Sequence, residues 1–226
     1  WARAPAPMSA VYSRYCNAAE HRTTEPVSLI ARPMPVELAR EAFALYMEYP
    51  GAMSVFCDGR TYRDTVAMER FARRNARRGS TEARQPNDGR FTVVRDLTEW
   101  MSRHAHEVEK FCMFFDTAEQ AQAALPRFRA LAGAEVVQGS PDNIELTAQG
   151  VDKGTALLAL ADLLHIPRES TVAVGDSEND RAMLEKAGIA AVMANGMPHI
   201  QALADLVSTN DCDHDGVAEL FERLGL

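Results

Sequence analysis

The stretch TVAVGDSENDRAML, residues 171–184, decides the fold and raises a question about charge. It begins as an apolar run that ends at Gly175, which predicts a buried strand over 171–175. Polar residues follow at once, and they are Asp176, Glu178, Asn179 and Asp180. Carboxylates this close together repel one another, and a cation or a reacting group usually offsets that repulsion. A helix is predicted directly after the strand, over 177–188.

The sequence on both sides of this stretch alternates between predicted helices and predicted strands. The segment 152–166 reads as an amphipathic helix, with one apolar stripe formed by Leu157, Leu160, Ala161 and Leu164. Further strands are predicted at 189–194 and 206–209, with helices at 197–204 and 215–225. This alternation predicts an α/β fold, with a parallel sheet and helices on its faces.

The middle of the chain has another pattern, which indicates a separate α+β unit. A hairpin is predicted over 53–64, with Asp58 and Gly59 at its turn. The other predicted strands are 27–31, 91–94, 108–115 and a pair on either side of 140–142. The predicted helices are 35–49, 67–79, 97–104 and 117–132, the last with a break near Pro126.

Composition limits the class of protein. The chain has 226 residues, of which 46% are hydrophobic and 25% charged, as in globular proteins. It contains neither an apolar run of the roughly 18–20 residues that a membrane helix needs nor a signal-peptide pattern. The four cysteines form no CxxC pair. We therefore expect a soluble, reduced, cytoplasmic protein that does not bind membranes.

Charge is distributed unevenly along the chain. Residues 1–110 carry 17 basic and 14 acidic residues, a net charge of about +3, and residues 111–226 carry 7 and 18, about −11. An acidic total does not favour nucleic-acid binding. The acidic C-terminal half suits a divalent cation, although most such charges simply face water.

The segment around Gly175 has the chemistry of a phosphate and metal site. Ligands of open parallel sheets bind beyond the carboxyl ends of the strands. Asp176 and Asp180 are four residues apart and share a face of the following helix, and carboxylates suit Mg²⁺. Asn179 and the N–H groups of the helix start can hold phosphate oxygens. Lys153 opens another predicted helix, and its ammonium group could neutralise a phosphate and a nucleophile together. Taken singly, such an Asp is more often a helix cap and such a Lys is usually solvated.

The joint arrangement resembles one known family. The segments IELTAQGVDKGTALLALADLLHI, VAVGDSENDRAMLEKAG and DGVAELFERLG are similar to the C-terminal part of the haloacid dehalogenase (HAD) superfamily, and within it to the Cof-type IIB phosphatases. The resemblance implies a HAD-like core over 150–226 and an α+β cap over 25–149, with 1–24 as a remnant of the core that leads into the cap.

The resemblance also implies an activity, which is Mg²⁺-dependent hydrolysis of a small phosphorylated metabolite such as a sugar phosphate through an aspartyl-phosphate. It assigns Lys153 to catalysis and phosphate binding, Asn179 to phosphate binding, Asp176 to catalysis as a Mg²⁺ ligand, and Asp180 to catalysis and support of the metal site. Ser177 and Glu178 are interpreted as spectators whose backbone forms the turn.

The family's nucleophile lies in a DxDGT motif before the cap, and nothing before residue 25 matches that motif. FCDGRT, 56–61, has Phe56 at the nucleophile's position and reads as a hairpin turn. The chain begins with Trp1, and YCNAA, 15–19, resembles the family's lead-in to its cap. Two explanations are open, namely a fragment of an ordinary phosphatase, which we favour, or an inactive variant that binds phosphate or a partner.

Other motifs carry weaker hypotheses. DCDHDGVAELFE, 211–222, fits the calcium-loop pattern with Asp211, Asp213, Asp215, Gly216 and Glu222. Against this reading, the sequence predicts a helix from Val217 onward. The arginine cluster at 70–78 is interpreted as a solvated helix face, with phosphate or nucleic-acid binding as the alternative. His104, His106, His165, His199 and His214 have no metal-ligand spacing and receive no role.

Overall fold

The computed structural model describes residues 31–77 and 91–226, and the chain divides into two compact units. Unit 1 comprises the residues up to 136 together with 141–149, and unit 2 comprises 137–140 and 150–226. The predictions for 1–24, for most of the strand 27–31 and for the loop 80–90 lie outside the described residues. The assignment of the units to a cap and a core stays a prediction. No helix in the described ranges is both long and apolar enough to cross a membrane.

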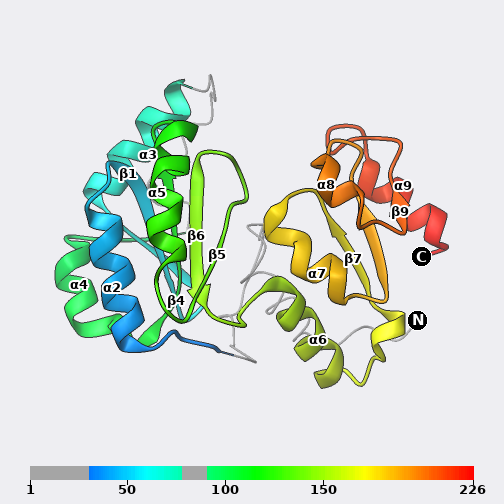
Figure 1. The fold of residues 1–226 in the computed structure, drawn as a ribbon, viewed down its shortest axis with the longest axis horizontal. Coiled ribbons are helices and arrows are strands. Elements are labelled where there is room, and N and C mark those ends of the chain that lie inside the picture. The colour runs from blue at the N-terminus through cyan, green and yellow to red at the C-terminus, as the bar shows by residue number, and fades with distance from the viewer. Residues whose placement is uncertain (1–30, 78–90) are drawn as a thin grey trace. The chain divides into compact units, whose positions relative to one another are not determined.

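Unit 1 is built on a six-stranded sheet with the strand order β3-β2-β1-β4-β6-β5 (Figure 1). The strands are β1 (Gly51–Cys57), β2 (Arg60–Asp64), β3 (Thr92–Val94), β4 (Val108–Phe115), β5 (Ala134–Val137) and β6 (Asn143–Ala148). Strands β2, β1, β4 and β6 pair antiparallel in that order, and β3 runs parallel to β2. This mixed sheet with its helices confirms the predicted α+β pattern.

The hairpin between β1 and β2 turns at the predicted residues. Asp58 and Gly59 have φ values of 45° and 68°, so both lie in the left-handed region that a two-residue hairpin turn requires. The Asp-Gly pair is therefore explained by the geometry of the turn. Its resemblance to a nucleophile motif has no structural counterpart.

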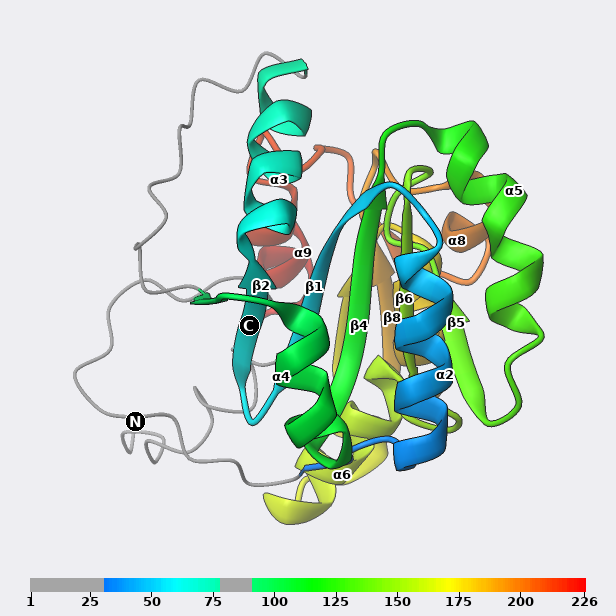
Figure 2. The ribbon, with the colours of Figure 1, turned by 90° about the vertical axis from the view of Figure 1, so that its left-hand side faces the viewer.

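Three helices cover one face of this sheet, as Figure 2 shows: α2 (Val36–Met47), α4 (Leu97–His104) and α5 (Ala118–Arg129). Tyr46 of α2 is fully buried, with its ring centroid 5.6 Å from that of Phe111 on β4 and 4.3 Å from that of Phe128 on α5. Aromatic rings at these separations add to the energy of apolar burial. The main core of unit 1 lies between this face and the three helices.

Helix α3 (Thr65–Arg77) uses its arginines differently from the prediction. Arg74 donates two hydrogen bonds to Asp142, at 2.8 and 3.1 Å, and lies over the ring of Phe114. Arg70 donates to the carbonyl of Gly51 at 2.7 Å. The interpretation of the cluster as a solvated face is therefore wrong for these two residues, because they fasten α3 to its own unit.

Helix α5 also differs from the prediction, since it continues through Pro126 without a break. Proline lacks an N–H and removes one bond from the helix interior. Pro126 is exposed, whereas Ala121, Leu125 and Phe128 of the same helix are buried in the core. Packing of this apolar face outweighs the local cost of the proline.

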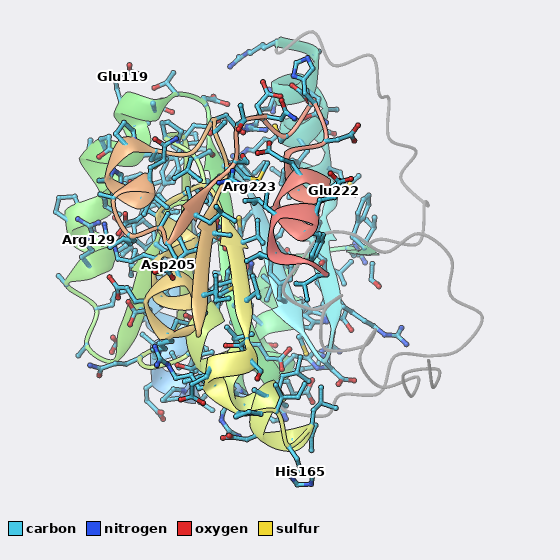
Figure 3. The ribbon with its side chains drawn as sticks, turned by 90° about the vertical axis from the view of Figure 1, so that its right-hand side faces the viewer. Glu119, Arg129, His165, Asp205, Glu222 and Arg223 are labelled. Atoms are coloured by element: carbon cyan, nitrogen blue, oxygen red, sulfur yellow. The ribbon has the colours of Figure 1, made fainter. Side chains whose placement is uncertain are left out.

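Unit 2 contains a parallel sheet with the order β7-β8-β9, which confirms the predicted parallel pairing. The strands are β7 (Val172–Gly175), β8 (Ile189–Val192) and β9 (Leu206–Val207). The helices are α6 (Lys153–Leu163), α7 (Arg181–Lys186), α8 (Pro198–Gln201) and α9 (Gly216–Leu224). Arg223 on α9, labelled in Figure 3, donates to the carbonyl of Val207 at 2.8 Å and so joins the last helix to the edge strand.

Helix α6 does not have the single apolar stripe that was predicted. Only Gly154 and Ala161 are buried among its residues, and Leu163 is 49% exposed. Leu157 packs partly against the core of unit 2. Apolar residues occur all around this helix, and only the face toward α7 is closely packed.

We predict that Pro126→Ala stabilises unit 1. A proline in a helix interior costs about 3 kcal/mol through its missing N–H and its ring clash together. Replacing it adds up to about 1 kcal/mol of unfolded-state entropy, so the free energy of unfolding should rise by about 2 kcal/mol. Pro35→Ala is the control, because Pro35 is also exposed but stands at the N-cap of α2. Urea unfolding that shows no gain for Pro126→Ala, or an equal gain for both variants, would contradict this account.

Candidate functional site

The candidate site is the turn that follows β7. The predicted continuous helix over 177–188 is in fact split into a 3₁₀ turn, Glu178–Asp180, and the short helix α7. The side chain of Ser177 caps this turn, and the Asp180 carboxylate reaches back along the chain. Asp180 Oδ2 accepts hydrogen bonds from the backbone N–H groups of Asp176 at 3.0 Å and Ser177 at 3.3 Å. The capping box therefore fixes the turn as a 3₁₀ element in front of α7.

Gly175 makes this turn possible through a close approach. A Cβ atom at Gly175 would lie 2.5 Å from the Cβ of Asp180 and 2.9 Å from its Oδ2. A side chain at the end of β7 would thus occupy the space of the carboxylate. The glycine that precedes the acidic run is required by packing.

The structure brings Lys153 and Asp180 together, although 27 residues separate them. Lys153 Nζ donates to Asp180 Oδ1 at 2.5 Å. Asp180 is only 5% exposed, and each of its carboxylate oxygens accepts at least one hydrogen bond. A buried carboxylate needs such partners, because burial without them costs several kcal/mol. Asp180 therefore suits the predicted supporting role better than that of a direct metal ligand.

Asp176 has a different environment from Asp180. Its side chain is exposed at the carboxyl end of β7, and its backbone carbonyl accepts from the N–H of Met197 at 2.9 Å. Neighbouring atoms of the turn remove part of the water around the Asp176 carboxylate, and this loss of solvation, followed by the nearby charge of Asp180, raises the pKa of Asp176 above its ordinary value. A cation beside Asp176 would relieve this repulsion, and an accessible carboxylate is a ligand that Mg²⁺ accepts together with water.

Asn179 is held by its oxygen. Asn179 Oδ1 accepts from the hydroxyl of Ser177 at 2.8 Å, which turns the amide nitrogen away from Ser177. That nitrogen can donate to an anion. Ser177 was interpreted as a backbone spectator, but its hydroxyl orients the amide, and this correction could not be read from residue spacing.

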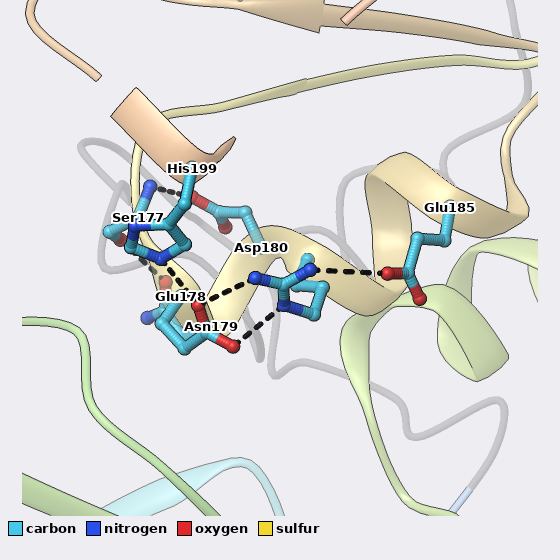
Figure 4. A network of polar contacts seen from close by, with 7 residues as sticks. Ser177, Glu178, Asn179, Asp180, Glu185 and His199 are labelled. Carbon is cyan, nitrogen blue, oxygen red and sulfur yellow. Dashed lines mark hydrogen bonds and ion pairs between the residues drawn. The ribbon is translucent and has the colours of Figure 1, made fainter. Parts of the chain in front are cut away.

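Figure 4 shows a second network at the turn that the sequence did not indicate. The Glu178 carboxylate accepts from Arg181 Nε at 2.7 Å and lies 2.8 Å from Nε2 of His199 on α8. Arg181 extends the network to Glu185 at 3.4 Å. Glu178 was interpreted as a spectator and His199 received no role, yet the two residues connect the turn to α8. A contact across 21 residues leaves no local signal, so sequence spacing could not have found it.

The calcium-loop pattern of 211–222 does not form a loop. Asp211 accepts from the N–H of Asp213 at 3.0 Å and contacts His214 Nδ1, and α9 already begins at Gly216. Glu222 lies in that helix, as Figure 3 shows. Within 31–77 and 91–226, no group of three or more His, Cys, Asp or Glu side chains is arranged to hold a metal ion. The residues 211–222 of the described chain therefore form no calcium loop.

We predict that Gly175→Ala disrupts the turn. The added methyl group must displace the Asp180 carboxylate, so the amide hydrogens of Asp176 and Ser177 should exchange faster with solvent. Overpacking of this kind typically lowers the free energy of unfolding by about 1–3 kcal/mol. Hydrogen exchange followed by NMR measures both amides, and unchanged exchange at both would mean that the close approach is not needed.

Comparison with known proteins places these features in a family. Residues 23–221 match the family model of haloacid dehalogenase-like hydrolases. The phosphatase YwpJ of Bacillus subtilis is 39% identical over 106 residues, an alignment that covers 47% of this chain and 37% of YwpJ. The 5-amino-6-(5-phospho-D-ribitylamino)uracil phosphatase YcsE of Bacillus subtilis is 32% identical over 118 residues, covering 52% of this chain and 47% of YcsE. The chain thus spans less than half the length of these curated relatives.

The fold gives the same result. A solved haloacid dehalogenase-like hydrolase from B. subtilis matches with a TM-score of 0.68 and 26% identity, over 85% of this chain and 72% of that chain. The α/β architecture predicted from the sequence is therefore confirmed. The match of the family model extends over most of the chain, and this chain belongs to the haloacid dehalogenase-like hydrolases.

Proposed function

We propose that this chain carries the C-terminal half of the active site of a Mg²⁺-dependent phosphatase that hydrolyses a small phosphorylated metabolite. The observation that supports this proposal best is the turn after β7, where Lys153, the buried Asp180 and the exposed Asp176 lie at the carboxyl end of a parallel strand. Phosphoryl transfer needs positioned positive charge around the transferred group more than it needs covalent chemistry from the protein.

The donor set at the turn fits Mg²⁺. We assign Asp176 as the residue that would hold the ion, since its carboxylate is accessible. Asp180 would support the site indirectly, through its hydrogen bonds to the turn and to Lys153. When bound, Mg²⁺ would neutralise and polarise the oxygens of a phosphate group. Mg²⁺ typically keeps several waters and is bound by one or two carboxylates together with substrate phosphates, so the Asp176 carboxylate can act with few other protein ligands.

The remaining roles follow from the protein's own side chains. The Lys153 ammonium carries a fixed positive charge beside Asp180, and it would stabilise negative charge on a phosphate and on an attacking carboxylate. The Asn179 amide nitrogen would donate a hydrogen bond to a phosphate oxygen, because the amide oxygen is bonded to Ser177. In the proposed reaction a carboxylate attacks phosphorus and displaces the alcohol of the monoester, so that an aspartyl-phosphate forms. Water then cleaves the aspartyl-phosphate, which releases inorganic phosphate and regenerates the carboxylate.

The nucleophile is the part of this reaction that the printed sequence does not supply, because no DxDGT motif occurs in it. In the described part of the chain, β7 pairs with β8 on one side and with no strand on the other. A strand that ran parallel to β7 along this edge would end at the same side of the sheet as Asp176. We propose that a strand of this kind, outside the 226 residues, carries the nucleophile.

Two relatives support the chemical class of the substrate. One is named as a phosphatase, and the other as the phosphatase of a phosphorylated ribityl compound. A small phosphorylated metabolite is accordingly the partner that we propose, and nucleic acid is not. The second candidate is a protein without catalysis that binds phosphate or a partner at the same turn, and it is considered because the printed sequence contains no DxDGT motif. The cytoplasmic location stays a prediction.

We predict that the printed chain releases no phosphate from phosphate monoesters, whereas the protein extended in frame by its natural upstream codons does so with Mg²⁺ and not with EDTA. Those codons should encode an apolar strand ending in DxDGT. In the extended protein, Lys153→Met and Asp176→Asn should each lower kcat by about 100-fold or more, as the loss of one preorganised charge does. Phosphate release from a panel of sugar phosphates measures all four proteins.

The matched control is Glu222→Gln, which removes an acidic residue of the calcium pattern on α9 and should leave turnover unchanged. Lys153-dependent hydrolysis by the printed chain would show that its nucleophile lies within these 226 residues. Upstream codons without the motif, or an inactive extended protein, would favour the phosphate or partner binder.

A further inference from the structure

Three consecutive residues at the start of α6 all contact α7 or the turn before it. Lys153 reaches Asp180, which directly precedes α7, and Gly154 lies against the backbone of Ala182 in the first turn of α7. Asp152, the N-cap of α6, contacts Lys186 at the last residue of α7. The start of α6 therefore contacts both ends of α7, through the neighbouring and oppositely charged residues Asp152 and Lys153.

The contact between Asp152 and Lys186 has well-defined geometry. Lys186 Nζ donates to the two carboxylate oxygens of Asp152 at 2.8 and 3.0 Å, and to the hydroxyl of Thr155 at 2.8 Å. Asp152 also caps α6, since it accepts from the N–H of Thr155 at 2.7 Å. A negative charge at the N-terminus of one helix and a positive charge at the C-terminus of another are each favoured by the helix dipoles.

Gly154 sets how closely the two helices can approach. A Cβ at this position would lie 2.1 Å from the carbonyl oxygen of Ala182, and 2.7 Å from a side-chain carbon of Lys186. The backbones of α6 and α7 thus touch beside Lys153. The Lys186 side chain crosses this contact before it reaches Asp152.

A lysine on a four-carbon stem does not place its own charge, because that stem is flexible. The position of the Lys153 ammonium depends on where the first turn of α6 is held. The Asp152–Lys186 pair holds that turn from the far end of α7, while Asp180 receives the ammonium at the near end. The side chains of Lys186 and Asp152 are 37% and 17% exposed, and a half-exposed pair of this kind contributes little to the free energy of unfolding.

We propose that Lys186 and Asp152 are positioning residues for Lys153, which they hold against Asp180 by fixing the first turn of α6. This inference rests on the proposed function only for the use to which the enzyme puts Lys153. The placement itself is a property of this chain and needs neither substrate nor metal.

The chain offers a direct test, because it contains only three lysines, Lys110, Lys153 and Lys186. A ¹H–¹⁵N spectrum of the lysine ammonium groups at low temperature should show Lys153 as a signal protected from water exchange by its ion pair. In Lys186→Met, we expect the Lys153 signal to broaden or disappear, while Lys110, paired with Glu145 in unit 1, keeps its signal. Lys186→Arg should restore the Lys153 signal.

The matched control is Arg223→Met, which removes an ion pair to Glu219 whose side chains are 42% and 17% exposed, against 37% and 17% for Lys186 and Asp152. Lys153 should keep its signal in this control. An unchanged Lys153 signal in Lys186→Met would overturn the proposal, and so would an equal loss in Arg223→Met, which would mark a general effect of destabilisation.

If Lys186→Met does not fold, Asp152→Asn tests the same idea, since the amide keeps the shape and an oxygen for the N–H of Thr155 but loses the charge. The same loss of the Lys153 signal is then expected, and an unchanged signal overturns the proposal. Failure of phosphate hydrolysis in the extended protein would leave these spectra unaffected, so the two proposals fail separately.

Discussion

The buried carboxylate of Asp180 is the interaction on which the candidate site depends. One of its oxygens closes the turn after β7 through two backbone N–H groups, and the other receives the ammonium group of Lys153. Without these partners, burial of a carboxylate that is only 5% exposed would lower the free energy of unfolding by several kcal/mol. Gly175 leaves the space that this carboxylate fills, and the contact between α6 and α7 brings the lysine to it. The buried charge of Asp180 thus requires a fixed arrangement of the turn and of α6. The same turn leaves Asp176 accessible to solvent.

Much of this arrangement could be predicted from the sequence, because strand ends and helix starts in a parallel sheet meet at one edge. The hairpin at Asp58-Gly59 and strand β4 follow from local sequence patterns. The grouping of Lys153 with Asp180 was implied by the family resemblance, since 27 residues separate them. The rest could not be predicted, since it depends on contacts far apart in sequence. Packing of Phe128 carries α5 through Pro126, and the contact of Glu178 with His199 joins two surface residues without a sequence signal.

The two acidic patterns of unit 2 show why spacing alone does not define a metal site. The residues 211–215 match the sequence pattern of a calcium loop, but the Asp211 carboxylate accepts a hydrogen bond from the backbone N–H of Asp213. Gly216 packs closely, since a Cβ atom at this position would lie 2.3 Å from the carbonyl oxygen of Asn210. That packing begins α9 where the calcium loop would have to continue. At 176–180, Asp180 is buried and hydrogen-bonded, Glu178 is paired with Arg181 and His199, and Asp176 is exposed, so the three carboxylates have different environments.

The most direct measurement of the central claim is a ¹H–¹⁵N backbone spectrum of the printed chain, titrated with Mg²⁺ and then with inorganic phosphate. The account predicts that Mg²⁺ shifts the amide signals of Asp176 and Ser177, that phosphate then shifts Asn179, and that Asp176→Asn removes the first response. Signals of residues 211–216 should not move. Shifts confined to 211–216, or no response at the turn after β7, would contradict the claim that this turn is half of a phosphoryl-transfer site.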